Sequence, residues 1–155
     1  VVALNSLRPT TDDVLIGLAA SGSTPYVVSA IRHAREKGLF TVGVANNPRT
    51  PVLEEADLAI LLDTGPEILT GSTRLKAGTS QKLVLNRIST IAMVLNGKVV
   101  SNLMVDVKAK NAKLKDRCAR IVCELAPNVT KDEALALLAQ QEWSIRRVLQ
   151  GLSAV

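Results

Sequence analysis

Three short aliphatic runs are the feature that most constrains how this chain can fold. They are Val14 to Leu18 (VLIGL), Phe40 to Ala45 (FTVGVA) and Leu58 to Leu62 (LAILL). Each run has the length of a buried strand and is bounded by turn-forming or charged residues. The segment between the first two has the length of a helix, and a strand, helix and strand at this spacing form a crossover with parallel strands. We therefore predict an α/β protein built on a parallel sheet.

The helix between the first two runs has recognisable ends. Ser23 or Thr24 can cap it, Pro25 suits its first turn, and Gly38 suits its end. Of the 155 residues, 47% are hydrophobic but only 2% are aromatic, so aliphatic side chains must build the core. This composition predicts strands that are covered on both faces, because such strands consist of continuous aliphatic runs.

A longer helix is predicted within residues 72–95. Its hydrophobic side chains recur at spacings of three and four, which predicts a buried stripe along one face; the stripe consists of Val84, Ile88, Ile91 and Leu95. Gly97 ends this helix, and an extended stretch follows at residues 99–104.

The last part of the chain is predicted to be helical. Asp106 is expected to cap a helix that reaches Leu125, and Thr130 and Glu133 form a capping box that opens a further short helix. We therefore divide the chain into an α/β domain, residues 1–125, and a small helical annex, residues 126–155.

The formal net charge of +5 suits an anionic partner, although it equally suits plain solubility. Lysines cluster between residues 108 and 115, but the only aromatic residues are Tyr26, Phe40 and Trp143. Because binding of single-stranded nucleic acid depends on aromatic stacking, we expect a solvated helix face there and no nucleic-acid partner.

Other classes of site are also not expected. His33 lacks the Cys and His neighbours of a metal centre, so we expect no metal and no cofactor. Cys118 and Cys123 lie on different faces of one predicted helix and are expected to stay reduced, as in an intracellular protein. No apolar run is long enough to span a membrane, and we expect a cytoplasmic protein without membrane contact.

The turn after the first strand has the chemistry of an anion site. Ser21, Gly22, Ser23 and Thr24 connect the predicted strand to the start of a helix. Backbone N–H groups, hydroxyls and the positive end of the helix dipole converge at such a turn, which favours a phosphate. An ordinary capped helix has the same composition, so this pattern leaves both interpretations open.

A second polar segment follows the third strand. Between Gly65 and Thr79 it offers the Glu67 carboxylate, several hydroxyls, and the cations Arg74 and Lys76. In a parallel sheet this segment lies at the carboxyl edge, where open α/β folds bind ligands. A solvated loop with a capped helix remains the alternative.

These segments resemble the N-acetylmuramic acid 6-phosphate etherases. The similarity runs through Ser21 to Val27 (SGSTPYV), Gly65 to Asn86, Gly97 to Val99 and Asn102 to Val107, and its most specific part is Gly71 to Asn86. The resemblance implies the phosphosugar-binding SIS superfamily, a flavodoxin-like sandwich with three α/β/α layers, and a homodimer. It also implies a cytoplasmic role in recycling cell-wall amino sugars, and a C-terminal annex that resembles a ubiquitin-associated bundle.

The resemblance further implies a reaction. These etherases cleave the D-lactyl ether of N-acetylmuramic acid 6-phosphate to N-acetylglucosamine 6-phosphate and D-lactate, without a metal. Elimination followed by addition of water needs one carboxylate to remove the carbon-bound proton and one acid to help lactate leave. Binding of the phosphate would orient the sugar ring against those groups.

Site residues follow from the same resemblance. Ser21, Gly22, Ser23 and Thr24 match the phosphate loop, with Ser21 and Thr24 as hydroxyl donors. Many etherases have Arg where this chain has Ser23. The residues that match the second loop, and are expected at the sugar site or a dimer seam, are Glu67, Ser72, Thr73 and Lys76.

The length departs from the family pattern. Etherases run to about twice this length, and the front half carries both carboxylates assigned to acid and base work. We therefore expect the C-terminal half of an etherase, with no catalytic residue in this chain, weak binding of phosphorylated amino sugar and no turnover. Either a second copy or a chain that completes the sheet is expected as partner. The alternative is a non-catalytic sensor or regulatory module that resembles glucokinase regulatory protein.

Overall fold

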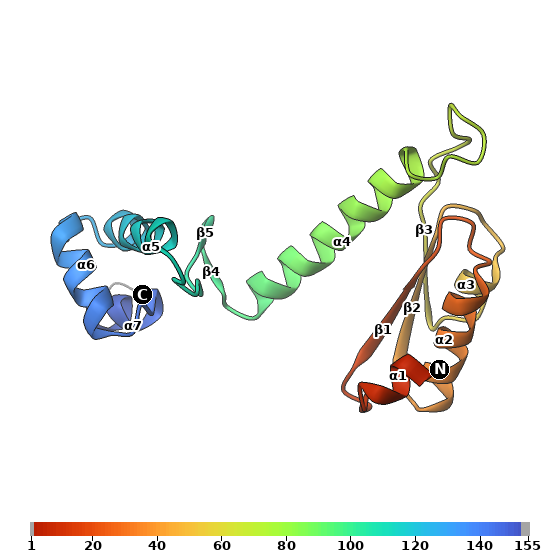
Figure 1. The fold of residues 1–155 in the computed structure, drawn as a ribbon, viewed down its shortest axis with the longest axis horizontal. Helices are drawn as coiled ribbons and strands as arrows, with labels where there is room; N and C mark the ends of the chain where they lie inside the picture. Colours follow the sequence, from red (N-terminus) through yellow and green to blue (C-terminus); the bar gives the residue numbers. More distant parts are fainter. Residues whose placement is uncertain (1, 153–155) are drawn as a thin grey trace. The chain divides into compact units, whose positions relative to one another are not determined.

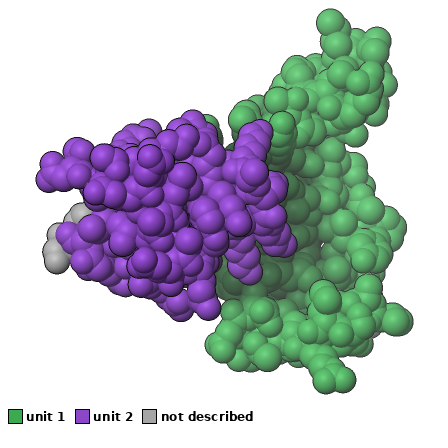
Figure 2. Space-filling model, turned by 60° about the vertical axis from the view of Figure 1, so that its left-hand side comes forward, with its two compact units in different colours: residues 1–87 green, residues 88–155 purple. Residues whose placement is uncertain are grey.

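The computed structural model describes residues 2–152 (Figure 1). The chain divides into two compact units, residues 1–87 and 88–155 (Figure 2). The first unit contains a three-stranded sheet, and the second contains a two-stranded hairpin and three helices. The elements are α1 (Val2–Ser6), β1 (Val14–Leu18), α2 (Pro25–Glu36), β2 (Phe40–Ala45), α3 (Pro51–Glu54), β3 (Leu58–Leu61), α4 (Lys76–Leu95), β4 (Val99–Val100), β5 (Leu103–Met104), α5 (Ala112–Leu125), α6 (Lys131–Gln140) and α7 (Ile145–Gly151).

The sheet of the first unit confirms the prediction of an α/β fold with parallel strands. Its order is β1-β2-β3, and both pairs of strands are parallel. All three predicted strands are present, and β3 ends one residue earlier than expected, at Leu61. Because the strands are parallel, their carboxyl ends meet at one edge of the sheet.

Helices α2 and α3 pack on the same face of this sheet. Gly17 of β1 and Gly43 of β2 are partners in the register. A Cβ at Gly17 would lie 2.8 Å from Cδ1 of Ile31 in α2, and one at Gly43 would lie 1.9 Å from the carbonyl oxygen of Val52 in α3. The two glycines therefore let both helices approach the strands closely, and Ile31, Val52 and Ala45 form the centre of this core.

The opposite face of the sheet is only partly covered. Val14, Phe40 and Leu58 point to that face and are 55%, 50% and 48% exposed. The strands carry aliphatic side chains on both faces. The prediction that both faces are covered is met only in part by the described residues, because α2 and α3 cover one face and the strand starts on the other face are exposed.

The predicted buried stripe of α4 is wrong for its C-terminal half. Val84 and Ile88 are half-buried, whereas Ile91 is 56% and Leu95 is 81% exposed. Ala77, in the first turn, is the single buried residue of this helix. The periodicity correctly identifies an apolar face, but among residues 2–152 nothing covers its end.

In the second unit, α5, α6 and α7 share one hydrophobic core. Cys118 and Val122 of α5 pack in the same cluster as Leu138 of α6 and Leu149 of α7. The helices of the expected annex therefore pack against α5, and the domain boundary at residue 125 stays a prediction. Cys118 and Cys123 are free thiols, and burial raises the pKa of the Cys118 thiol.

The helix N-caps of the second unit match those predicted from the sequence, with one exception. Thr130 and Glu133 form the predicted capping box at the start of α6. The expected cap at Asp106 is wrong, because α5 begins later and the Asn111 side chain accepts from the Leu114 N–H at 2.9 Å. The Asp106 carboxylate instead pairs with Lys98 at 3.2 Å. Among the described helices, none is long and apolar enough to cross a membrane.

Candidate functional site

The three parallel strands place three polar loops at one edge of the first unit. These are the turn after β1, the Asn-Asn pair after β2 and the long loop between β3 and α4 (Figure 1). Both sequence-predicted segments lie at this carboxyl edge, where open α/β sheets bind their ligands. The candidate site is therefore built from the ends of β1, β2 and β3.

The turn after β1 presents backbone donors to solvent. Among residues 2–152, the N–H groups of Ser21 and Thr24 have no hydrogen-bond acceptor. The Gly22 N–H is used within the turn, where it donates to Ala19 O at 2.9 Å, and the Ser23 N–H donates to Ser21 Oγ at a long 3.4 Å. The turn therefore keeps two backbone donors at the start of α2, where the helix dipole favours an anion.

The hydroxyls of this turn are also accessible. Thr24 is the N-cap residue of α2, yet its side chain makes no capping hydrogen bond. Ser21, Ser23 and Thr24 are all exposed. Because the Thr24 hydroxyl does not satisfy the helix end, it can donate to a bound anion instead.

Gly22 holds the turn in shape. Its φ is +73°, and a Cβ there would lie 2.1 Å from Thr50 Oγ1. Its carbonyl accepts from the Val52 N–H at 3.0 Å, which ties the turn to α3. The positive φ and the close approach of Thr50 both require glycine.

Asn46 connects the ends of two strands to α4, a role that the sequence analysis missed. Its Nδ2 group donates to Leu62 O at 3.0 Å and to Ser80 Oγ at 2.9 Å, and also lies 3.3 Å from Thr64 Oγ1. Its Oδ1 atom accepts from Gln81 Nε2 at 3.0 Å. This one half-buried amide thus fixes the start of α4 against the carboxyl edge of the sheet.

Asn47 reaches in the other direction, since its Nδ2 atom lies 3.5 Å from Ser21 O. The Asn-Asn pair therefore lies between the two predicted loops and touches both. Its position directly after β2, at the carboxyl edge of the sheet, is the sequence signal that could have identified it.

The Glu67 carboxylate accepts hydrogen bonds from the backbone, so its oxygens are already used within the protein. Its two carboxylate oxygens accept from the N–H groups of Lys76 and Ala77, each at 2.9 Å. These two backbone hydrogen bonds are the main cause that lowers the pKa of Glu67 below its usual range. Glu67 is thus the cap of α4 and holds the polar loop against this helix.

Ser72, Thr73 and Lys76 lie in the tight turn that leads into α4. The turn is closed by the Gly78 N–H, which donates to Thr73 O at 2.8 Å, and by the Leu75 N–H, which donates to Ser72 O at 3.1 Å. The Thr73 and Lys76 side chains are exposed, and Ser72 is half-buried. The structure thus brings all four predicted residues of the second loop to the first turn of α4.

A cavity of about 610 Å³ opens beside this turn, lined by Thr64, Arg74, Leu75, Lys76, Thr79, Ser80 and Leu83. Within the described part of the chain, neither Arg74 nor Lys76 forms an ion pair. Lys76 does interact electrostatically with Glu67, and the two cations together favour an anionic ligand in this cavity.

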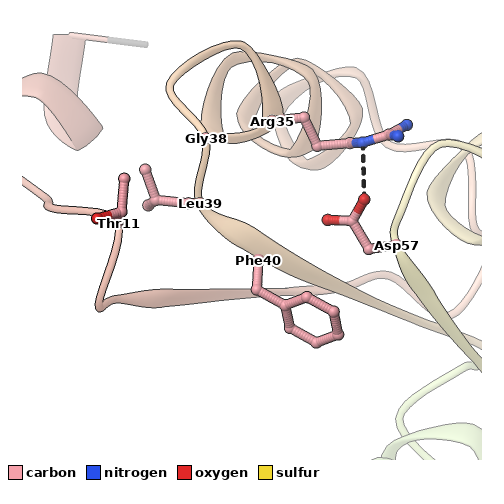
Figure 3. A pocket seen from close by; sticks show the side chains of 6 residues that line it. All are labelled: Thr11, Arg35, Gly38, Leu39, Phe40 and Asp57. Atoms are coloured by element: carbon pink, nitrogen blue, oxygen red, sulfur yellow. Dashed lines mark ion pairs between the residues drawn. The ribbon is translucent and has the colours of Figure 1, made fainter.

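A second cavity, of about 370 Å³, lies at the amino edge of the sheet (Figure 3). Its two charged side chains neutralise each other, because Arg35 Nε lies 3.1 Å from Asp57 Oδ1. Asp57 also accepts from the N–H and the hydroxyl of Thr41, at 2.9 and 2.7 Å. These groups satisfy one another, so the cavity at the carboxyl edge is the better candidate for a ligand.

Comparison with known proteins identifies the family of this chain. Residues 7–88 match the family described as the SIS domain. The N-acetylmuramic acid 6-phosphate etherase of Yersinia pestis (strain Pestoides F) is 52% identical over 155 residues, 97% of this chain and 52% of the relative. The etherase of Yersinia pseudotuberculosis serotype O:1b (strain IP 31758) gives the same values. The chain therefore spans about half the length of the curated relatives it matches.

Among solved structures, the chain is similar to the Vibrio vulnificus NanR protein complexed with ManNAc-6P. The TM-score is 0.48 and the sequences are 19% identical; the match covers 81% of this chain and 43% of that one.

Proposed function

This chain belongs to the SIS-domain family, and from that premise we propose that it is the phosphosugar-binding half of an N-acetylmuramic acid 6-phosphate etherase. The observation that carries the proposal is the 52% identity to etherases over 97% of the chain. The open donors of the turn after β1 support it, because a phosphate needs several N–H and O–H groups at one point.

We assign the sugar phosphate to the turn after β1. The N–H groups and hydroxyls of Ser21 and Thr24 donate to the phosphate oxygens, and Gly22 and Ser23 shape the turn. Ser72, Thr73 and Lys76 contact the sugar from the other side of β2. Glu67 positions these three residues through its hydrogen bonds to the start of α4.

The chemistry then divides between two halves of the complete protein. This chain binds and orients the phosphorylated amino sugar. Outside it, one carboxylate removes the carbon-bound proton and one protonated carboxyl group gives a proton to the leaving lactate. The chain alone binds weakly and does not turn over. A strand added to the free edge of β1, from a second copy or from the other half, and a cytoplasmic location belong to the same proposal.

The first test replaces Thr24 with Val and measures binding of N-acetylglucosamine 6-phosphate by calorimetry. Loss of one charge-assisted hydrogen bond should weaken binding by about 1 to 3 kcal/mol. Because Thr24 makes no capping hydrogen bond, the thermal stability should change little.

Thr11→Val is the matched control, since Thr11 lines the cavity at the amino edge of the sheet. It should bind the sugar phosphate as the unmodified chain does. If the Thr24→Val variant binds the sugar phosphate with the same affinity as the unmodified chain, Thr24 is not part of the site.

A second test concerns the reaction. A full-length protein that contains this chain should release D-lactate from N-acetylmuramic acid 6-phosphate. Retained sugar-phosphate binding without release of lactate would contradict the etherase and favour a regulatory module.

A further inference from the structure

The cavity beside the first turn of α4 has features that phosphate binding does not use. It lies at the carboxyl edge, on the β3 side of the sheet, and is lined by residues of the loop after β3 and of α4. The turn that we assign to the phosphate follows β1 at the other side of β2. Two strand spacings separate the ends of β1 and β3, which is about 10 Å.

The free donors in this cavity are side chains rather than helix amides. Glu67 already accepts from the N–H groups of Lys76 and Ala77. The Thr79 hydroxyl donates to Leu75 O and the Ser80 hydroxyl donates to Ala77 O, each at 2.7 Å. Arg74 and Lys76 thus remain as the cations that can bind an anion.

The same cavity also has an apolar wall. Leu83 is 52% exposed and lines it, together with the half-buried Leu75. A phosphate has no apolar group that could pack against two leucines. A three-carbon 2-hydroxy acid, in contrast, carries a carboxylate and a methyl group on the same carbon atom. The combination of two cations with two leucines fits such a group.

We propose that this cavity binds the lactyl substituent of the sugar, with its carboxylate against Arg74 and Lys76 and its methyl group against Leu75 and Leu83. The inference rests on the proposed function, because it needs a sugar that carries a phosphate at one end and a lactyl ether at the other. Arg74 then distinguishes the etherase substrate from its product, which has the same phosphate but no lactyl group.

The test compares two ligands and three forms of the chain by NMR titration. The ligands are N-acetylmuramic acid 6-phosphate and N-acetylglucosamine 6-phosphate. The proteins are the unmodified chain, Arg74→Gln, and the control Arg87→Gln, which removes an equal charge from α4 outside the cavity. The unmodified chain and the control should prefer the lactyl sugar, and Arg74→Gln should reduce that preference about tenfold.

The binding of N-acetylglucosamine 6-phosphate should be the same in all three forms, since that sugar does not reach Arg74. Arg74→Lys should restore part of the preference, because it restores the charge but not the planar guanidinium. D-lactate alone should shift the resonances of residues 74–79 and leave those of residues 21–24 unchanged.

The outcomes separate the two proposals. Equal binding of both sugars to the unmodified chain, or an unchanged preference in Arg74→Gln, overturns the lactyl site and leaves the proposed function standing. If inorganic phosphate displaces D-lactate from residues 74–79 and binds there with the same affinity as D-lactate, the cavity is a general anion site and the inference is wrong. If neither sugar phosphate shifts residues 21–24, the proposed function fails and this inference fails with it.

Discussion

At the scale of single residues, the site depends on which polar groups are already satisfied. Glu67 has the sequence signature of a ligand-binding carboxylate, but the start of α4 uses both its oxygens. Thr24 has the signature of a helix cap, but its hydroxyl does not cap. Residue type alone could not separate these roles, because each depends on where the neighbouring backbone N–H groups point.

The lowered pKa of Glu67 makes part of the stability dependent on pH. The ionised carboxylate binds the start of α4 better than the acid does, so its contribution is complete above the ordinary pKa of 4.5 and is lost as the pH falls through the lower folded value. Glu67→Gln should therefore lower the melting temperature at pH 7, and the difference from the unmodified chain should shrink towards pH 3.

Thermal unfolding followed by circular dichroism at pH 7, 5 and 3 measures this difference. Glu54→Gln is the control, because Glu54 is exposed in α3 and its side chain makes no hydrogen bond within the described residues. A difference between Glu67→Gln and the unmodified chain that stays constant from pH 7 to pH 3 would contradict the capping role.

At the scale of elements, Asn46 holds the loops together. Its amide bridges the end of β3 and the first turns of α4 through Leu62, Ser80 and Gln81. Asn46→Ala should reduce the free energy of unfolding by roughly 1 to 3 kcal/mol, because it leaves part-buried polar groups without partners.

Chemical denaturation checks this value, and Asn47→Ala is the control. Asn47 is exposed and has one long contact, 3.5 Å to Ser21 O, so its replacement should change stability much less. Equal losses in the two variants would show that Asn46 has no special role in holding α4.

The elements themselves were largely predictable, and their long-range contacts were not. The strands follow from short aliphatic runs, and α2 follows from Thr24, Pro25 and Gly38 at its ends. The cap predicted at Asp106 was wrong because α5 begins later, where the Asn111 side chain caps it. The role of Asn46 was missed because its partners are 16 to 35 residues away in the chain.

At the scale of the whole molecule, the length of the chain limits what it can do alone under the proposed function. It spans about half the length of the etherases it resembles. Composition predicted that both faces of the sheet are covered, and helical periodicity predicted a buried stripe on α4. Within residues 2–152, however, Val14, Phe40 and Leu58 of the sheet are exposed, and so are Ile91 and Leu95 of α4. Local sequence sets which faces are apolar, whereas long-range packing decides which of these faces are covered.

Under the proposed function, the turn after β1 binds the phosphate of an amino sugar. An NMR titration of the isotope-labelled chain with N-acetylglucosamine 6-phosphate tests it most directly. We predict that the amide resonances of Ser21, Gly22, Ser23 and Thr24 shift with saturation, while those around Thr11 and Phe40 at the opposite edge stay fixed. If the resonances of the turn do not shift, or if those of the amino edge shift instead, the phosphate does not bind at this turn.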